Sequence, residues 1–369
     1  MLARTSAPSL LLGCALLAGC LPGSQRENTR ALTPADSAST ALAETVPVAD
    51  LEAVWTTDLT ERAPYPTGIA WLAADSAEAR LAVVETQEGA VHLLSASGDV
   101  QERWEAEGEF PYLAGVVGDT VAVFARGSER IDWLTAAGAA ASVPVPEGAS
   151  AAFVDRTRTL VRIGGTLSEF PAALVELDGS GEETARFPLA VDWRASGYLR
   201  PWGSAVLSLS GYRPVVDVWT PRSPAGQTLD TLALTGFANP QLVRSYQFML
   251  GEVDEPPLLT SAARALGDRL YVLNLRAERV RIDVYDREGQ ILRVLHGPVP
   301  TDPEDRPAVL DAYPADFDVR ETPEGLAFAV LLRRDRGILQ QAAARVTLFR
   351  LAEAPGVRAD EAPADSAEA

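Results

Sequence analysis

The stretch Leu266–His296, LGDRLYVLNLRAERVRIDVYDREGQILRVLH, decides the fold class. It contains a short apolar run, LYVLNL, then the alternating segment RIDVYD and a final apolar run, ILRVL. A turn centred on Gly289 separates the last two segments. Runs of β-type residues joined by short turns are typical of consecutive antiparallel strands. The stretch therefore predicts a strand, a loop, a second strand, a tight turn and a third strand.

Six segments of the chain repeat this pattern. Their first apolar runs begin, in order, at Leu81, Val121, Leu160, Ala205, Leu270 and Leu326, with steps of 40, 39, 45, 65 and 56 residues. A period of roughly 40 residues with about four short strands per unit is typical of a β-propeller blade. The two long steps contain insertions rich in proline and acidic residues, Thr235–Arg264 and Gly297–Glu324. The spacing predicts an all-β, six-bladed propeller.

The apolar runs are continuous, as in LAVV, TVAVF and LAFAVLL, and do not alternate with polar residues. Continuous runs indicate strands buried on both faces, as in blades that stack on two neighbours. A β-sandwich is the structural alternative, and it predicts cleaner alternation without a fixed period. The sequence favours the propeller.

The last unit lacks an outer strand, because the chain passes from RVTLFRLA directly into a polar tail. Conversely, the strand-like segment Leu51–Leu59, LEAVWTTDL, precedes the first unit and has no unit of its own. We predict that this N-terminal strand pairs into the last blade and closes the ring, which hides two exposed sheet edges. The propeller is then expected to span residues 51–352.

This repeat pattern resembles the bacterial six-bladed β-propeller lipoproteins, a loose group akin to NHL-repeat and gluconolactonase-like propellers. No blade carries a strict family motif that matches residue by residue. For the gluconolactonase type, the resemblance implies a divalent cation held by Glu, Asn and Asp side chains near the channel. Glu85, Asn274 and Asp316 or Asp318 are the candidates, but no ligand spacing supports them. The sequence therefore predicts no metal site and no cofactor.

The N-terminus has the pattern of a bacterial secretory signal. Arg4 precedes the apolar segment SLLLGCALLAG, which is too short to span a bilayer. Residues 17–20, LAGC, resemble the lipobox, in which signal peptidase cuts on the N-terminal side of the cysteine and lipid is attached to that cysteine; an ordinary signal peptide is the alternative. Residues 1–20 are thus expected to be a lipoprotein signal ending at Cys20. The resemblance also implies that Leu21 permits sorting to the outer membrane, with the protein facing the periplasm.

Two polar segments flank the predicted propeller. Residues 21–50 and 353–369 are rich in Ala, Ser, Thr, Pro and acidic residues and show no sustained periodicity. Such composition predicts a disordered tether before the propeller and a disordered acidic tail after it.

Charge and composition exclude several functions. The formal net charge is −19 and the chain has no lysine, so nucleic acids and anionic membrane surfaces should repel it. We expect no nucleic acid partner, and membrane contact only through the lipid. Cys14 and Cys20 lie before the folded part, which leaves it without a disulfide or a cysteine zinc site. No GxSxG, P-loop or dinucleotide fingerprint occurs.

Tyrosines and arginines concentrate in two sets of loops. The propeller resemblance implies that the loops leading into innermost strands and the loops between second and third strands share one face. Planar guanidiniums bind carboxylate or phosphate groups, and tyrosine rings stack on sugars or peptides. The predicted ligand-binding residues are Tyr65, Tyr112, Arg126, Tyr198, Arg213, Asn274, Arg276, Tyr313 and Arg333. The alternative is that these are ordinary hairpin residues without a role.

Three functions follow from these observations. The first is a monomeric, membrane-anchored binding or scaffolding module whose partner is an envelope protein, a peptide or a glycan at the central-channel face. The alternative is a metal-dependent lactonase or lyase of the gluconolactonase-like or NHL propeller type. A purely structural envelope component is the third. Fold alone does not choose among them, nor does it decide whether the protein is an enzyme.

Overall fold

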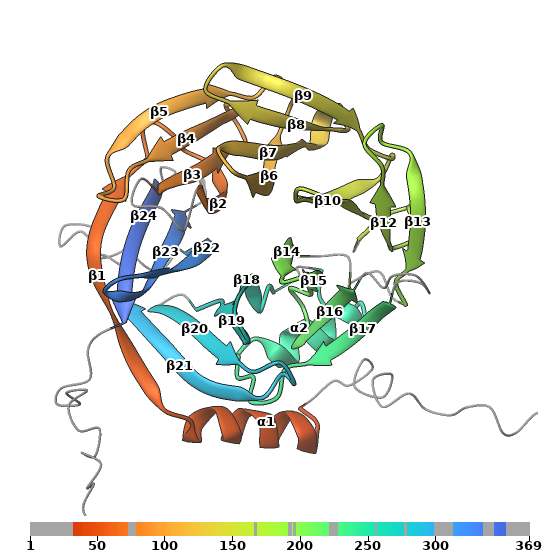
Figure 1. Cartoon of the computed structure of the whole chain (residues 1–369). Coiled ribbons are helices and arrows are strands. Elements are labelled where there is room, and N and C mark those ends of the chain that lie inside the picture. The colour runs from red at the N-terminus through yellow and green to blue at the C-terminus, as the bar shows by residue number, and fades with distance from the viewer. Residues whose placement is uncertain are drawn as a thin grey trace, which may run out of the picture.

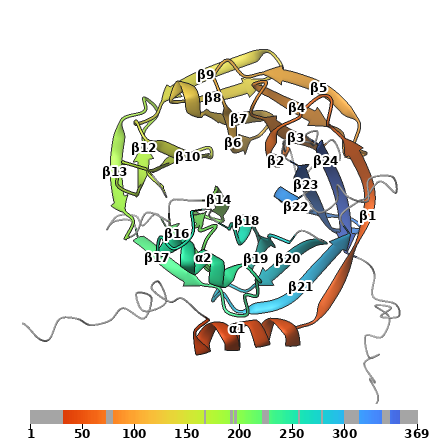
Figure 2. The same ribbon diagram turned by 180° about the vertical axis from the view of Figure 1, so that it is seen from behind.

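The computed structural model describes residues 32–72, 79–165, 168–190, 194, 197–220, 228–254, 257–276, 279–298, 313–334 and 343–351. These residues form a ring of β-sheets around a central channel (Figure 1), and Figure 2 shows the same ring from behind. The predicted signal sequence with Cys20 and the predicted C-terminal tail lie outside the described residues.

Four of the sheets have four antiparallel strands each, and the first strand of each lies innermost (Figure 1). The first two sheets consist of β2 (Pro66–Leu72), β3 (Arg80–Glu85), β4 (Ala90–Leu94) and β5 (Val100–Glu105), and of β6 (Pro111–Val117), β7 (Thr120–Ala125), β8 (Arg130–Thr135) and β9 (Gly138–Pro144). The next two consist of β10 (Ala149–Val154), β11 (Thr159–Ile163), β12 (Ala173–Leu177) and β13 (Glu183–Pro188), and of β14 (Leu199–Trp202), β15 (Ala205–Leu209), β16 (Val215–Thr220) and β17 (Thr228–Ala233).

The prediction of six separate blades is wrong. The fifth and sixth units form one eight-stranded sheet with the order β18-β19-β20-β21-β1-β24-β23-β22. Its strands are β1 (Val48–Asp58), β18 (Thr260–Leu266), β19 (Arg269–Asn274), β20 (Arg279–Tyr285), β21 (Ile291–Pro298), β22 (Tyr313–Thr322), β23 (Gly325–Arg334) and β24 (Ala343–Leu351). The ring thus contains four four-stranded blades and one eight-stranded sheet.

The strand β1 joins the two units because it satisfies two sheet edges. Its first residues, Val48–Asp50, pair in parallel with β21. From Leu51 to Asp58 it pairs antiparallel with β24, with a register shift between Ala53 and Trp55. The expected pairing of the N-terminal strand with the last unit is therefore present, but the same strand also covers the edge of β21, which the sequence did not indicate.

Two helices lie within segments that the sequence left without structure. α1 (Pro34–Thr45) falls in residues 21–50, which were assigned to a disordered tether. A capping box between Thr33 and Asp36 starts this helix, which lies beside β21 at the rim of the ring in both views. α2 (Leu242–Met249) occupies the insertion 235–264. Within the part of the chain that the structure describes, no helix is long and apolar enough to cross a membrane.

The core lies between neighbouring sheets, as the continuous apolar runs predicted. Leu81, Ala82, Val83 and Val84 of β3 are all 0 % exposed, so both faces of this strand are covered. One cluster joins Ala82 and Val84 to residues of β6 and β7 in the next sheet. Each fully buried Val or Leu contributes about 1.5–3 kcal/mol, so the stacked sheets form a firm frame for the channel loops.

Candidate functional site

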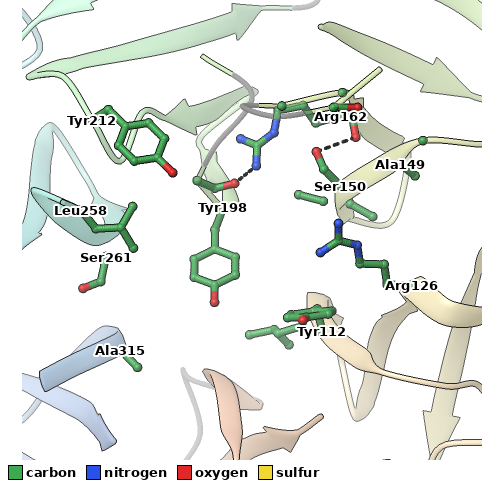
Figure 3. Close-up of a pocket in the computed structure, with 18 of the residues that line it drawn as sticks. Tyr112, Arg126, Ala149, Ser150, Arg162, Tyr198, Tyr212, Leu258, Ser261 and Ala315 are labelled. Atoms are coloured by element: carbon green, nitrogen blue, oxygen red, sulfur yellow. Dashed lines mark hydrogen bonds between the residues drawn. The ribbon is translucent and has the colours of Figure 1, made fainter. Parts of the chain in front are cut away.

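A cavity of about 610 Å³ opens at one mouth of the central channel. We call it the channel-mouth pocket. The first residues of innermost strands from several sheets line it, among them Tyr112 of β6, Ala149 of β10, Ser261 of β18 and Ala315 of β22 (Figure 3). Tyr198 lines it from the position just before β14. Because these strands begin at the same mouth, residues far apart in the sequence meet there.

The connection between β7 and β8 supplies one charged part of the wall. Arg126 lies in a short 3-10 helix, η1 (Arg126–Ser128), and its side chain is exposed. No hydrogen bond or ion pair joins this guanidinium to any residue that the structure describes. Figure 3 shows it reaching into the cavity. A positively charged group without a partner is therefore available to a ligand.

Arg162 of β11 supplies a second guanidinium, and its side chain is buried, with the residue 2 % exposed. Its Nη1 donates to Ser208 Oγ over 3.1 Å and its Nη2 donates to Gly197 O. Its Nε has no hydrogen-bond partner within the described part of the chain. Burial lowers the pKa of Arg162 to about 9, although the carboxylate of Asp217 acts in the opposite direction. The group is still positively charged at neutral pH.

Arg333 is the third arginine of the lining, and it is held in place by its neighbours. Its guanidinium carbon lies 4.2 Å from the centroid of the Tyr65 ring. Its Nε donates to Tyr313 Oη over 3.1 Å, and its Nη1 donates to Pro66 O over 3.1 Å. These contacts fix the side chain at the wall and orient the hydroxyl of Tyr313, which also lines the cavity.

Tyrosines give the pocket flat polar walls. The hydroxyl of Tyr198 donates to Thr67 O over 2.9 Å, and burial raises the pKa of this phenol well above its usual range. It therefore remains a neutral donor. Tyr112 and Tyr212 also line the cavity, and Tyr212 packs on Phe248 with ring centroids 5.4 Å apart. Rings of this kind present both an apolar face and a hydrogen-bonding edge.

The charge of this lining contrasts with the charge of the chain. Its described residues include three arginines, Arg126, Arg162 and Arg333, and one carboxylate, Glu129. The whole chain carries a formal charge of −19. A local excess of positive charge in a cleft attracts anions, and the surrounding acidic surface limits nonspecific binding of anions elsewhere.

Further along the innermost strands, four charged residues form ion pairs with one another. We call Arg200, Arg264, Asp316 and Asp318 the arginine–aspartate layer. Arg200 Nη2 lies 3.0 Å from Asp316 Oδ2, and Arg264 Nη2 lies 3.0 Å from Asp316 Oδ1. Arg264 Nε lies 3.2 Å from Asp318 Oδ1. These residues come from β14 and from β18 and β22, the two end strands of the eight-stranded sheet, so the layer ties two sheets together.

Backbone groups complete the layer. Ile69 N donates to Asp316 Oδ2 over 3.1 Å, and Trp71 N donates to Asp318 Oδ2 over 2.8 Å, both from β2. Burial raises the pKa of Asp318, because removal from water disfavours the carboxylate, while Arg264 opposes this shift. Burial also lowers the pKa of Arg200, with repulsion from Arg264 acting in the same direction. The charges are thus paired but held at a cost in desolvation.

The candidate metal ligands have other partners in the structure. Asp316 binds two arginines, as described above. Glu85 accepts a hydrogen bond from Tyr65 N over 3.0 Å, and Asn274 donates to Asp283 over 2.8 Å. Among the described residues there is no group of three or more His, Cys, Asp or Glu side chains arranged to hold a metal ion.

The nine predicted binding residues divide into two groups. Five of them line the channel-mouth pocket: Tyr112, Arg126, Tyr198, Tyr313 and Arg333. Tyr65 lies next to them, under the guanidinium of Arg333. The structure does not bring the other three, Arg213, Asn274 and Arg276, into the lining of this cavity.

These three residues secure the insertion that carries α2. The guanidinium carbon of Arg213 lies 3.9 Å from the centroid of the Tyr246 ring. Asn274 is 0 % exposed and donates to Ala238 O over 3.0 Å. Arg276 donates to the same carbonyl over 2.7 Å. Their polar groups hold the chain before α2 against the sheet.

Sequence reasoning missed Arg162, which lies in a strand and not in a loop. The segment TLVRI of β11 places one arginine inside a run that is otherwise apolar, apart from its first residue. Arginine is almost never fully buried unless it has a partner. The isolated charge within a buried second strand was therefore a readable signal for a polar site.

No protein-family model matches the chain, and no curated protein sequence matches it either. Solved structures with a similar arrangement include a gluconolactonase from Xanthomonas campestris, with 14 % identity, a TM-score of 0.48 and coverage of 79 % of this chain and 89 % of that one. Virginiamycin B lyase from Staphylococcus aureus has 10 % identity and a TM-score of 0.42 over 79 % and 98 % of the two chains. Glutaminyl cyclase from Myxococcus xanthus has 12 % identity and a TM-score of 0.38 over 82 % and 98 %. Likeness at this level carries no argument about activity.

Proposed function

We propose that this protein is a monomeric binding module of the bacterial cell envelope, and that the channel-mouth pocket holds part of its partner, a protein, peptide or glycan. The observation that carries the proposal is the guanidinium of Arg126, which has no partner among the described residues and lies in a pocket with an excess of arginine over carboxylate. Its volume of about 610 Å³ falls in the range of small-ligand sites, so a side chain, a chain end or a sugar unit fits it.

The test is retention of envelope components by immobilised protein. The variant Ser261→Trp fills the pocket from β18, and Ser142→Trp on the exposed outer strand β9 is the matched control. We expect a set of peptides or glycans, identified by mass spectrometry, that the wild type and Ser142→Trp retain and Ser261→Trp does not. Equal retention by all three proteins contradicts the proposal.

We also propose that the protein is anchored by lipid on Cys20 and faces the periplasm from the outer membrane. The support is the signal sequence, with residues 17–20 as a lipobox. Cell fractionation tests it: the wild type should sediment with the outer membrane, and Cys20→Ser should not become labelled by a radioactive fatty acid. Labelling of Cys20→Ser at the wild-type level contradicts the proposal.

A metal-dependent lactonase or lyase is the second candidate function. Its support is the resemblance of the sequence repeats to gluconolactonase-like propellers. Among the described residues, no group of three or more His, Cys, Asp or Glu side chains is arranged to hold a metal ion. Its test is a melting curve with and without Ca²⁺ or Zn²⁺, together with hydrolysis of a simple sugar lactone. A cation-dependent melting shift and turnover would favour the enzyme over the binding module.

A further inference from the structure

We infer that the channel-mouth pocket binds the carboxylate of a small acidic ligand and that Arg126 anchors it; this inference rests on the proposed function. The first argument is the state of the positive charges. Arg126 has no partner among the described residues, and the Nε of buried Arg162 has none either. The guanidinium of Arg126 is exposed, so an acceptor on a ligand can reach it.

The second argument is that charge in this channel is elsewhere matched. In the arginine–aspartate layer, Arg200 and Arg264 each form an ion pair with an aspartate at 3.0 Å. Neither Arg126 nor Arg162 forms an ion pair with a described carboxylate. Glu129, the carboxylate among the described lining residues, pairs with neither of them, so these two arginines are not bound by the type of group that neutralises Arg200 and Arg264 in the layer. A carboxylate from outside the chain is that type of group.

The third argument is shape. Guanidiniums bind carboxylates through two parallel hydrogen bonds, which requires a flat approach. Tyr112 and Tyr198 provide ring walls beside Arg126, and Phe170 and Leu258 add apolar surface to the lining. Figure 3 shows Tyr112, Tyr198 and Leu258 around the open space that Arg126 enters. A ligand with one carboxylate and one ring matches this combination.

Two natural sources carry such a group, an acidic sugar and the C-terminal end of a peptide. Four probes separate them in titration calorimetry with the folded protein. D-galacturonate is compared with D-galactose, and N-acetyl-L-tyrosine is compared with N-acetyl-L-tyrosinamide. Within each pair, the second compound carries a neutral group in place of the carboxylate of the first. Inorganic phosphate is titrated as a separate anion.

We expect one acid to bind at least about tenfold more tightly than its neutral counterpart, because a hydrogen bond to a charged group contributes about 1.5–3 kcal/mol. The affinity of the Arg126→Ala variant for that acid should fall by the same factor. Arg186→Ala is the control, since Arg186 pairs with Glu183 on the outer strand β13 and does not line the pocket. The affinity of the Arg186→Ala variant for the acid should equal that of the wild type.

The inference is overturned by equal binding of acid and neutral probe, by unchanged affinity in Arg126→Ala, or by tighter binding of phosphate than of either acid. Binding of a neutral probe that Ser261→Trp abolishes would leave the binding module standing while the carboxylate inference falls. Absence of binding by every probe also overturns the inference, and retention of envelope components then tests the proposed function separately.

Discussion

Arginines meet the central channel at two levels, and they are treated in opposite ways. In the arginine–aspartate layer, Arg200 and Arg264 are bound by Asp316, which is 0 % exposed. At the channel-mouth pocket, Arg126 has no partner among the described residues, and Arg162 donates only to a hydroxyl and a backbone carbonyl. The paired set holds strands of different sheets together. Arg126 contributes little that stability requires, as expected of a group kept for a ligand.

The largest effect should follow from breaking the layer. Asp316→Ala leaves two buried guanidiniums without their shared carboxylate, and removal of one partner from a buried ion pair costs about 3–5 kcal/mol. We expect the free energy of unfolding in urea to fall by this amount. Asp268→Ala is the control, since its ion pair with Arg287 is exposed and should contribute little. Equal stability of both variants would remove the distinction between the two levels.

The pH dependence of stability should show whether the buried charge of Arg162 is uncompensated, in contrast to the arginines that are paired with aspartate in the layer. The pKa of Arg162 in the folded protein is about 9, below its value in the unfolded chain. Between these two pKa values the unfolded chain binds more protons, so stability rises with pH; below pH 9 the cost of the buried charge is constant.

The measurement is the free energy of unfolding of the wild type minus that of Arg162→Met, determined from about pH 8 to 10.5. We expect this difference to increase with a slope of up to about 1.4 kcal/mol per pH unit above pH 9. A flat difference would mean that the charge of Arg162 is as well compensated as the charges of the layer.

A smaller effect is expected at the boundary between the two levels. Tyr198 lines the pocket, and the guanidinium carbon of Arg200 in the layer lies 4.6 Å from the centroid of its ring. Tyr198→Phe keeps the ring and removes the hydrogen bond to Thr67 O, which should cost about 1 kcal/mol of stability. Thermal melting monitored by circular dichroism measures the loss. A loss as large as that of Asp316→Ala would assign Tyr198 to the layer.

The smallest effect on stability is expected at Arg126. Because its guanidinium has no described partner, Arg126→Ala should change the free energy of unfolding by no more than about 0.5 kcal/mol. Urea unfolding under the same conditions as for Asp316→Ala gives the comparison. Strong destabilisation would show that Arg126 supports the fold, against the assignment of this residue to a ligand.

The sequence predicted local strands and their repeat well, because both depend on short apolar runs and turns. It also indicated five pocket residues, Tyr112, Arg126, Tyr198, Tyr313 and Arg333, since loops at one face of a repeated unit converge. It did not predict the union of two units by β1, because three residues, Val48–Asp50, decide that pairing with β21. This pairing depends on where the folded ring places the edge of β21, which is far from β1 in the sequence.

Two other features were readable but were not recognised. The capping box of α1, Thr33 and Asp36 with Pro34 at the first helical position, lay in a segment judged by composition alone. Arg162 lay in a strand where loop-based reasoning did not look. In both cases a single residue carried information that the average composition of the segment concealed.

The strand β1 also determines the order in which the ring can form during synthesis. Thr56 of β1 bonds to Thr347 of β24 over 3.0 Å, although the two residues are 291 positions apart in the chain. The strand β1 is therefore synthesised well before β24, its main partner. Contacts this distant slow folding, because the whole intervening chain must be ordered before the contact forms. The edges of β1 and β21 thus stay exposed for a long time during folding. Pairing of β1 with β21 and β24 covers these edges and protects them against aggregation.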